Sequence, residues 1–330
     1  MKLHFIAKFV CAIALITFLT GCSLSYTIKE PVPSRVKYEN ANIASVTLTI
    51  VDQRKDTDAV FILERLGAGS EMKEGKVVKF DNLEDPILYF ARNLEREMNS
   101  RNIPVKCVLG KSASEGFSLL IHKYQIANTR ATGFSPWESF HIFSATIVKN
   151  GQTKNIKAYF YNGKVPVWSM DEIQEPCFNI PMSIIIKDVA SKISNYFFNL
   201  RVADDKVSRL SDEINAEIEK NDFGAFWKVL ELGYTNNHQA TSYLRKYARM
   251  GDEFFKSCAV SAIGMLGGEE DIEFLKQSYK EGWYNDRYMA IKAIGDIGTP
   301  NALQFIQTLR KEPVYEKEDG LKYCVELYAP

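Results

Sequence analysis

The chain has 330 residues, 46% of them hydrophobic and 25% charged, and its 41 basic and 41 acidic residues give a formal net charge of zero. This length and composition suit two domains with ordinary packed cores. A nucleic-acid-binding protein needs a basic excess on at least one domain, so the charge balance argues against that class and we expect no nucleic-acid partner.

The first 21 residues have the layout of a secretory signal peptide. Lys2 and Lys8 precede an apolar run at 9–18, and residues 19–22 read Leu-Thr-Gly-Cys. A charged start, an apolar centre and small residues before the cut are typical of such peptides. The alternative is a plain transmembrane anchor, but a span needs about 20 apolar residues and this run is shorter.

Cys22, directly after the small pair, makes this segment similar to a bacterial lipoprotein signal. The resemblance implies cleavage before Cys22, acylation of that cysteine, and a mature chain held at a membrane by lipid without spanning it. Ser23 stands where an aspartate would favour retention in the inner membrane. The resemblance therefore implies a lipid-anchored protein of the outer membrane that faces the periplasm.

The next part of the chain combines a linker with strand and helix signals. The prolines and polar residues of 22–42 predict an extended tether between the lipid and the first domain. Strict polar and apolar alternation at 45–50 predicts a half-buried strand. Asp85 and Pro86 suit an N-cap and a first helical position, and apolar residues then recur at helical spacing, which predicts an amphipathic helix over 86–101.

Further β-rich runs predict strands at 103–108, 117–127, 140–149 and 153–161. Asn150-Gly151, between the last two runs, is typical of a tight hairpin because its turn needs two residues that tolerate positive φ. Pro181 opens a second predicted helix. This order predicts an α+β domain over residues 43–203, with two helices on one face of a mostly antiparallel sheet.

From about residue 208 the pattern becomes helical, and the sequence repeats itself with a period of 31 residues. Residues 259–267 read AVSAIGMLG and align with 290–298, which read AIKAIGDIG. A fixed period of helix pairs is the signature of a solenoid, and small alanines allow its helices to approach closely. We expect a left-handed glycine after each first helix, and Gly298-Thr299-Pro300 predicts a helix stop, an N-cap and the next helix start.

These repeats resemble short HEAT units of the phycobilisome-lyase type. The resemblance implies an all-α solenoid over residues 208–330, and solenoids present extended surfaces that usually bind protein. We expect the partner surface on the helix-lined face that carries Ser261, Lys292 and Asp296. A lyase activity would rest on fold analogy alone, which is a weak warrant.

The N-terminal half, over about residues 1–200, resembles the YajG-type outer-membrane lipoproteins. The matching pieces are the Leu-Thr-Gly-Cys run, the segment VDQRKD at 51–56, the helix end LEREMNSR at 94–101, the Asn150-Gly151 hairpin and the second helix. The resemblance implies a location in the cell and a fold, and it says less about an activity. The helical repeats are a departure from that family.

No motif for catalysis or metal binding is present in the sequence. It has no GxSxG, HExxH or GxGxxG run, no CxxC pair and no cluster of cysteine and histidine. His122 and His141 lie in predicted strands, where a surface or core role is more common than that of a general base. We therefore expect a protein that is not an enzyme and has no cofactor or metal.

Cysteine usage leaves one pairing open. Once Cys11 has left with the signal peptide and Cys22 has taken the lipid, Cys107 and Cys177 fall in one predicted domain. In an oxidising compartment they either form a disulfide or stay buried as free thiols. The remaining two, Cys258 and Cys324, lie about two repeats apart, which is too far for a bridge.

Residues 133–140 form an aromatic, proline-broken stretch that reads GFSPWESF. Its aromatic residues Phe134, Trp137 and Phe140 are candidates for contact with a partner or with lipid acyl chains, because exposed aromatic side chains often anchor interfaces. The alternative is that Trp137 fills one end of the domain core.

Two functions are consistent with these features. The first is a lipid-anchored envelope protein that acts as a non-enzymatic protein-binding scaffold through its HEAT-like repeats. The alternative is an auxiliary lipoprotein subunit of a machine that transports or assembles lipids or other envelope components. In that case the aromatic residues of 134–140 would contact lipid or a transport partner.

Overall fold

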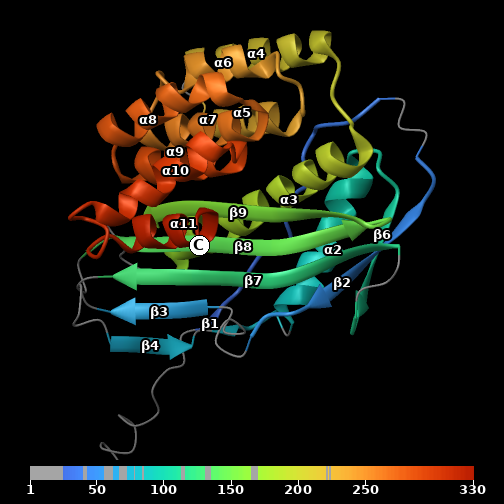
Figure 1. The fold of residues 1–330 in the computed structure, drawn as a ribbon, viewed down its shortest axis with the longest axis horizontal. Coiled ribbons are helices and arrows are strands. Elements are labelled where there is room, and N and C mark those ends of the chain that lie inside the picture. The colour runs from blue at the N-terminus through green and yellow to red at the C-terminus, as the bar shows by residue number, and fades with distance from the viewer. Residues whose placement is uncertain are drawn as a thin grey trace, which may run out of the picture.

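The computed structural model describes residues 25–39, 43–55, 62–66, 73–77, 79–83, 85–112, 116–130, 135–164, 170–220, 222 and 224–330. Its N-terminal half is built on a mixed β-sheet and its C-terminal part is helical (Figure 1). Within these ranges, no helix is long and apolar enough to cross a membrane. The predicted signal peptide, Cys22 and Phe134 lie outside the described residues.

The N-terminal half contains, in chain order, β1 (Ser25–Tyr26), β2 (Val46–Asp52), β3 (Ile62–Leu66), β4 (Lys73–Val77), β5 (Lys79–Phe80), α2 (Pro86–Ser100), β6 (Val105–Gly110), β7 (Phe117–Arg130), β8 (Trp137–Lys149), β9 (Gln152–Lys164), the short turns η2 (Met170–Ile173) and η3 (Glu175–Asn179), and α3 (Ile180–Phe198). The helical part contains α4 (Asp204–Glu219), α5 (Ala225–Tyr234), α6 (Ala240–Tyr247), α7 (Glu253–Leu266), η4 (Glu269–Asp271), α8 (Ile272–Glu281), α9 (Tyr284–Ile297), α10 (Pro300–Thr308), η5 (Leu309–Lys311) and α11 (Asp319–Tyr328).

The main sheet is mixed, with its longest pairings antiparallel, as predicted, and shorter parallel pairings that the sequence did not predict. β7 pairs antiparallel with β8 on one side, and β8 pairs antiparallel with the edge strand β9. On its other side β7 pairs in parallel with β2 at 118–121 and with β3 at 126–130, and β6 is parallel to β2. The physical reason is the connection through α2, because a helical crossover returns the chain in the parallel direction.

The local signals of this half are confirmed. The Asp85 carboxylate accepts hydrogen bonds from the backbone N–H groups of Ile87 and Leu88, and Pro86 occupies the first turn of α2. Asn150 and Gly151 have φ values of 50° and 78°, as the tight turn requires. β8 and β9 are therefore paired over their whole length, from Trp137 to Lys149.

Residues 25–39 are extended, but they are not a free tether, so that prediction is wrong for this segment. β1 pairs with β5, and the Tyr38 hydroxyl donates to the carbonyl oxygen of Tyr234, 2.8 Å away. The buried apolar side chains of the segment are Tyr26, Ile28, Val36 and Tyr38. Burial of this apolar surface fixes the segment across both halves of the molecule. We call residues 25–39 the strap.

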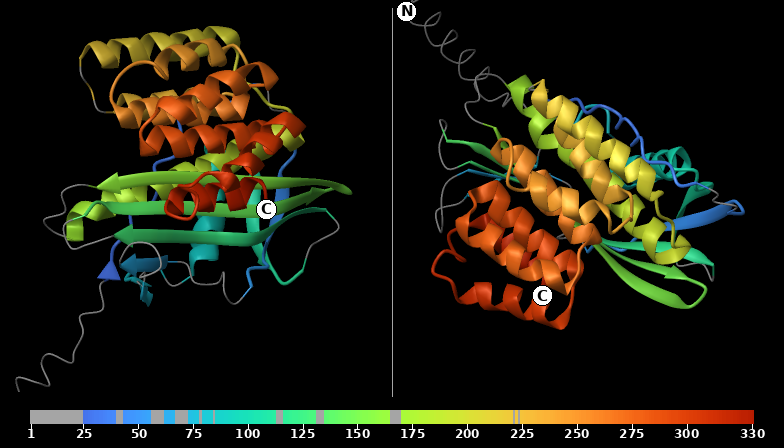
Figure 2. Two further views of the ribbon diagram at one scale, coloured as in Figure 1. Left: turned by 60° about the vertical axis from the view of Figure 1, so that its left-hand side comes forward. Right: turned by 90° about the horizontal axis from the view of Figure 1, so that it is seen from above.

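The helix pairs follow the sequence repeat. α5, α7 and α9 pack side by side, and α6, α8 and α10 lie against them (Figures 1 and 2). A Cβ atom on Gly264 of α7 would lie 2.3 Å from the Cα of Ala293 in α9, and one on Gly233 of α5 would lie 2.8 Å from the Cβ of Ala262 in α7. The two glycines are one period apart, so the repeat places the same close contact between successive helices.

The helix-end predictions have a mixed outcome. Gly298 ends α9 with a left-handed φ of 66°, the Thr299 hydroxyl accepts from the N–H of Ala302, and Pro300 begins α10. Gly267, in contrast, ends α7 with a φ of −73°, so the left-handed glycine predicted there is wrong. A Cβ at Gly267 would instead meet the Asp271 carboxylate at 2.6 Å.

The helical part closes over the β9 edge of the sheet. Phe143 of β8 stacks on Phe90 of α2, with ring centroids 4.9 Å apart, whereas Phe140 points to the opposite face and lies 5.5 Å from the Tyr323 ring of α11. α9 packs along β9 itself. Figure 2 shows the same arrangement from two sides. Covering a long edge strand in this way prevents it from pairing with another chain.

Candidate functional site

The helical face predicted to bind a partner is occupied by the chain's own α3. Lys292, 1% exposed, places its Nζ 3.0 Å from the Asp188 carboxylate of α3 and 2.9 Å from Asp296. Ser261 is also buried. The prediction is therefore wrong for these residues. The physical reason is that α3 is buried along most of its length and needs a cover on this side.

This contact is a closed cluster of two lysines and two aspartates. Lys192 Nζ of α3 lies 2.7 Å from Asp296, and the Tyr328 hydroxyl donates to the same carboxylate at 2.9 Å. Burial opposes the ionisation of Asp296, but Lys192 and Lys292 outweigh it and lower the pKa of this carboxyl. The cluster neutralises its own charges and joins the two halves, so we assign it a structural role.

The aromatic candidates are also internal. Trp137 and Phe140 are buried, and the Phe140 ring packs against Tyr161, with centroids 5.1 Å apart. The Trp137 ring lies 5.8 Å from the Arg130 guanidinium. As surface contacts for a partner, these two predictions are wrong, and the alternative of a core role describes them. The two residues are three positions apart in β8, so their side chains point to opposite faces of the sheet, and both faces are covered there.

The two histidines of the sheet, His141 and His122, have ordinary surroundings. Burial lowers the pKa of His141 to about 3, and its Nε2 lies 2.7 Å from the carbonyl oxygen of Cys177. This imidazole therefore stays neutral at ordinary pH. His122 is exposed and its Nε2 lies 2.8 Å from the Thr146 hydroxyl. Both environments are those of ordinary surface and core histidines.

The cysteines of the described residues, Cys107, Cys177, Cys258 and Cys324, are free thiols, so Cys107 and Cys177 do not form a disulfide in this structure. Burial, with a smaller contribution from Glu95, raises the pKa of Cys107 to about 12. A thiol that stays protonated is a poor nucleophile and a poor metal ligand. Across the described ranges, no group of three or more His, Cys, Asp or Glu residues is placed to hold a metal ion.

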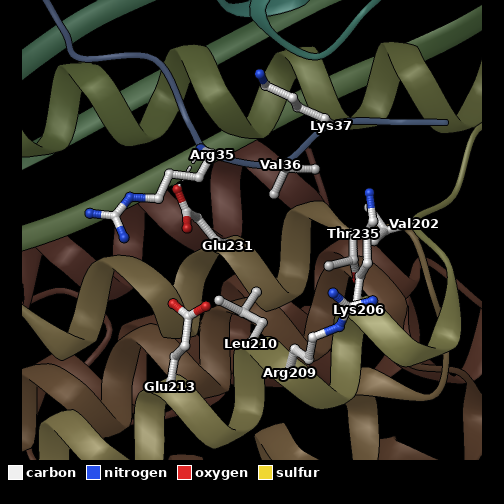
Figure 3. A pocket seen from close by; sticks show the side chains of 10 residues that line it. All are labelled: Arg35, Val36, Lys37, Val202, Lys206, Arg209, Leu210, Glu213, Glu231 and Thr235. Atoms are coloured by element: carbon white, nitrogen blue, oxygen red, sulfur yellow. Dashed lines mark hydrogen bonds between the residues drawn. The ribbon is translucent and has the colours of Figure 1, made fainter.

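A groove between the strap and the helices is the strongest candidate site. It consists of two adjoining hollows that share Arg35 and Glu231. The first, about 280 Å³, lies between residues 35–37, α4 and α5 (Figure 3). The second, about 470 Å³, lies between residues 29–35, the start of α3 and α5. We call both together the strap groove. Their volumes are comparable to those of small-molecule sites.

Most charges around the groove neutralise one another. Lys228 lies 2.7 Å from Glu213 and 2.8 Å from Glu217, and Lys206 pairs with Glu39. The further pairs are Arg209 with Asp205 and Lys29 with Glu175. Among the described residues, no carboxylate lies within 4.0 Å of the side-chain nitrogens of the lining residues Arg35, Lys37 and Lys187. Of the carboxylates that line the groove, Glu231 and Asp222 also have no basic side chain within 4.0 Å in the described part of the chain. The unpaired charges of the groove are therefore three positive and two negative, which leaves a small positive excess.

Lys187 and Glu231 lie deepest in this arrangement. Lys187 is 6% exposed, and its Nζ lies 4.2 Å from the centre of the Trp227 ring. Burial lowers the pKa of this lysine. Glu231 is buried too, and its Oε1 accepts a hydrogen bond of 2.7 Å from the backbone N–H of Arg35, as Figure 3 shows. Burial raises the pKa of Glu231. Both groups are held away from bulk water.

Sequence reasoning missed the groove because it joins residues almost 200 positions apart, as in the hydrogen bond from Arg35 to Glu231. One signal was available. Lys187, Asp188 and Lys192 lie in a helix rich in isoleucine, and buried charges are rare without a partner or a function. Only the folded chain shows that Asp188 and Lys192 belong to a cluster of ion pairs, whereas Lys187 does not.

Comparisons with known proteins leave the family open. No family model matches the chain, and no curated protein matches it. A crystal structure of an uncharacterised protein aligns over 53% of this chain and 99% of its own, with 10% identity and a TM-score of 0.30. A Xanthomonas campestris protein of the family DUF330 aligns over 50% of this chain and 92% of its own, with 10% identity and a TM-score of 0.33. Scores this low carry no argument, so the YajG and HEAT resemblances stay predictions.

Proposed function

We propose that this chain is a lipid-anchored, periplasm-facing protein of the bacterial outer membrane that binds a ligand in the strap groove and catalyses no reaction. The observation that carries the proposal is the unpaired positive charge of Arg35, Lys37 and Lys187 in one groove lined by both halves of the molecule. The Leu-Thr-Gly-Cys run supports the anchor. A machine that transports or assembles envelope lipids would use such a subunit, so the auxiliary-subunit function fits the same groove.

Because the strap is packed against the protein, the distance between Cys22 and the folded domain is short. Only residues 23 and 24 separate Cys22 from β1, and three extended residues span at most about 11 Å. An acylated Cys22 would therefore hold the body of the protein close to the membrane surface. Lys29, at one end of the groove, lies seven residues after Cys22, which limits its distance from the lipid to about 25 Å.

The test uses the full lipidated chain purified from membranes, with its bound small molecules extracted and identified by mass spectrometry. Arg35 and Lys37 are exposed, so the double variant Arg35→Glu with Lys37→Glu keeps the fold and reverses the charge of the groove. We expect it to lose a species that the wild type retains. The matched control, Lys280→Glu with Lys311→Glu, changes two exposed lysines elsewhere and should retain it. Equal retention by all three chains, or no bound species, would contradict the proposal.

A second candidate function is the protein scaffold, now moved to a different face. Trp283 is 74% exposed and Tyr284 is 49% exposed, next to each other at the start of α9. Exposed aromatic residues often anchor protein interfaces. If the repeats bind a protein, crosslinking in membranes should capture it with the wild type and not with the double variant Trp283→Ala, Tyr284→Ala. Capture of the same protein by both chains would remove these residues from the interface.

A further inference from the structure

The three buried lysines of the described residues have different electrostatic surroundings. Lys192 and Lys292 each contact the aspartates of the buried cluster, whereas Lys187 has no carboxylate within 4.0 Å in the described part of the chain. An ammonium taken out of water without a partner is unfavourable by several kcal/mol. Lys187 lines the second hollow of the strap groove, where an anion from outside the chain can reach it.

The walls around Lys187 are largely apolar. The indole of Trp227 lies 4.2 Å from its Nζ, and Ile180 lines the same hollow. On the strap side the hollow is bounded by Pro31-Val32-Pro33, and Val32 is 79% exposed. An anion that approaches Lys187 leaves this apolar surface in water unless it carries an apolar group of its own. The walls therefore favour an amphiphile over a small hydrated ion.

The acidic neighbours limit the charge of that anion. Glu231 lines the hollow and is buried, and Glu97 lies close enough to influence Lys187. Glu217, Glu175 and Glu30 line the hollow as well, and each has a basic partner. Asp222 also lines it and has no basic side chain within 4.0 Å among the described residues. A second negative charge on the ligand would be repelled by these carboxylates in a medium of low dielectric constant. A single negative charge is thus the best match.

From this geometry we infer that the second hollow of the strap groove binds a singly charged amphiphilic anion, with Lys187 as its ion-pair partner and Trp227 and the strap prolines against its apolar part. A fatty-acid carboxylate and the phosphodiester headgroup of an anionic phospholipid share this chemistry. The short reach between Cys22 and the groove places such molecules within access of the site. The inference rests on the proposed function and names the class of ligand for it.

The experiment titrates the full lipidated chain, in an uncharged detergent, with palmitate, with phosphatidylglycerol, with hexadecanol as an uncharged amphiphile and with inorganic phosphate. Binding is followed by calorimetry and by tryptophan fluorescence, because Trp227 lines the site. We expect palmitate, phosphatidylglycerol or both to bind, and hexadecanol and phosphate not to. Palmitate alone would identify a free acyl ligand, and phosphatidylglycerol alone would identify a headgroup.

Variants of Lys187 make the role of the lysine falsifiable. Lys187→Met should weaken binding about 30-fold or more, as the loss of a buried ion-pair partner does, while Lys187→Arg should retain binding. Lys149→Met is the matched control, because Lys149 also lies over a ring, 4.0 Å from the centre of Phe198, and lines neither hollow. Thermal unfolding checks the fold, and Lys187→Met should be no less stable than the wild type, since it removes an unpaired buried charge.

Three results would overturn the inference: no response to either charged amphiphile, equal binding of hexadecanol, or unchanged binding by Lys187→Met. If one of them occurs while the Arg35 and Lys37 double variant still loses its extracted species, the proposed function stands and only the ligand class is wrong. If the double variant retains everything as well, the proposed function fails with it.

Discussion

α3 carries two lysines, Lys187 and Lys192, that are both buried and lie five residues apart, yet they have opposite surroundings. Lys192 reaches across to Asp296 of α9 and belongs to a neutralised cluster. Lys187 faces a groove and a tryptophan ring, with no carboxylate of the described residues within 4.0 Å. The comparison teaches that a buried charge holds a fold together when its partner comes from the same chain. Lys187 lacks such a partner, and it is the residue for which we propose a ligand.

The largest expected effect comes from breaking the paired side. Asp296→Ala leaves Lys192 and Lys292 buried with less compensation, so it should lower the free energy of unfolding by about 3–5 kcal/mol. Urea unfolding followed by circular dichroism measures this. Asp212→Ala, at an exposed position of α4, is the control and should change stability by less than about 0.5 kcal/mol. A loss below 1 kcal/mol for Asp296→Ala would mean that the cluster does not hold the two halves together.

A smaller effect is expected from the helix contact behind the cluster. Gly264→Ala places a Cβ 2.3 Å from the Cα of Ala293, one residue after Lys292, and the two helices must move apart. Overpacking of this kind destabilises by about 1–3 kcal/mol, which a shift in the urea midpoint would report. Gly116→Ala is the control, because nothing lies within 4 Å of its Cβ position. Equal stability of the two variants would show that α7 and α9 are not tightly apposed.

The smallest effect is a pH dependence that separates the two kinds of lysine. Burial lowers the pKa of Lys187 in the folded chain below its value of about 10.4 in the unfolded chain. The contribution of Lys187 to the free energy of unfolding is therefore fully present above about pH 10.4, and it is lost as the pH falls through the pKa of the folded state. For Lys292, burial opposes protonation, but Asp188 and Asp296 outweigh it and raise the pKa of this lysine. The contribution of Lys292 to the free energy of unfolding is therefore fully present below about pH 10.4 and is lost at higher pH.

Urea midpoints measured from pH 7 to pH 10.5 test this difference through Lys187→Met. Relative to this variant, the wild type should gain stability as the pH rises, because the unpaired ammonium loses its proton. Parallel curves for the wild type and the variant would show that Lys187 is solvated like an ordinary surface lysine. Lys149→Met serves again as the control for removing a lysine over an aromatic ring.

Predictions from sequence succeeded where the physical cause is local. The cap of α2 by Asp85, the Asn150-Gly151 turn and the Gly298-Thr299-Pro300 junction each depend on a few adjacent residues. The predicted close approach of helices at small alanines is found at Ala262 and Ala293, which lie against Gly233 and Gly264 of the neighbouring helices. Tertiary contacts overruled the prediction of a free tether for residues 25–39 and that of surface positions for Trp137 and Phe140, and they added parallel pairs to the sheet.

The sequence by itself determined the helices and strands with strong local patterns, the caps at Asp85 and Gly298, the 31-residue period and the lipoprotein-like start, because propensity, turn chemistry and periodicity act over short distances along the chain. Only the tertiary structure decided which surfaces remain free. Whether Lys292 faces a partner or α3, and whether Lys187 has a counter-ion, depends on segments far away along the chain, such as the one that carries Asp188 for Lys292. The electrostatic meaning of a charged residue depends on its neighbours in space, which periodicity does not encode.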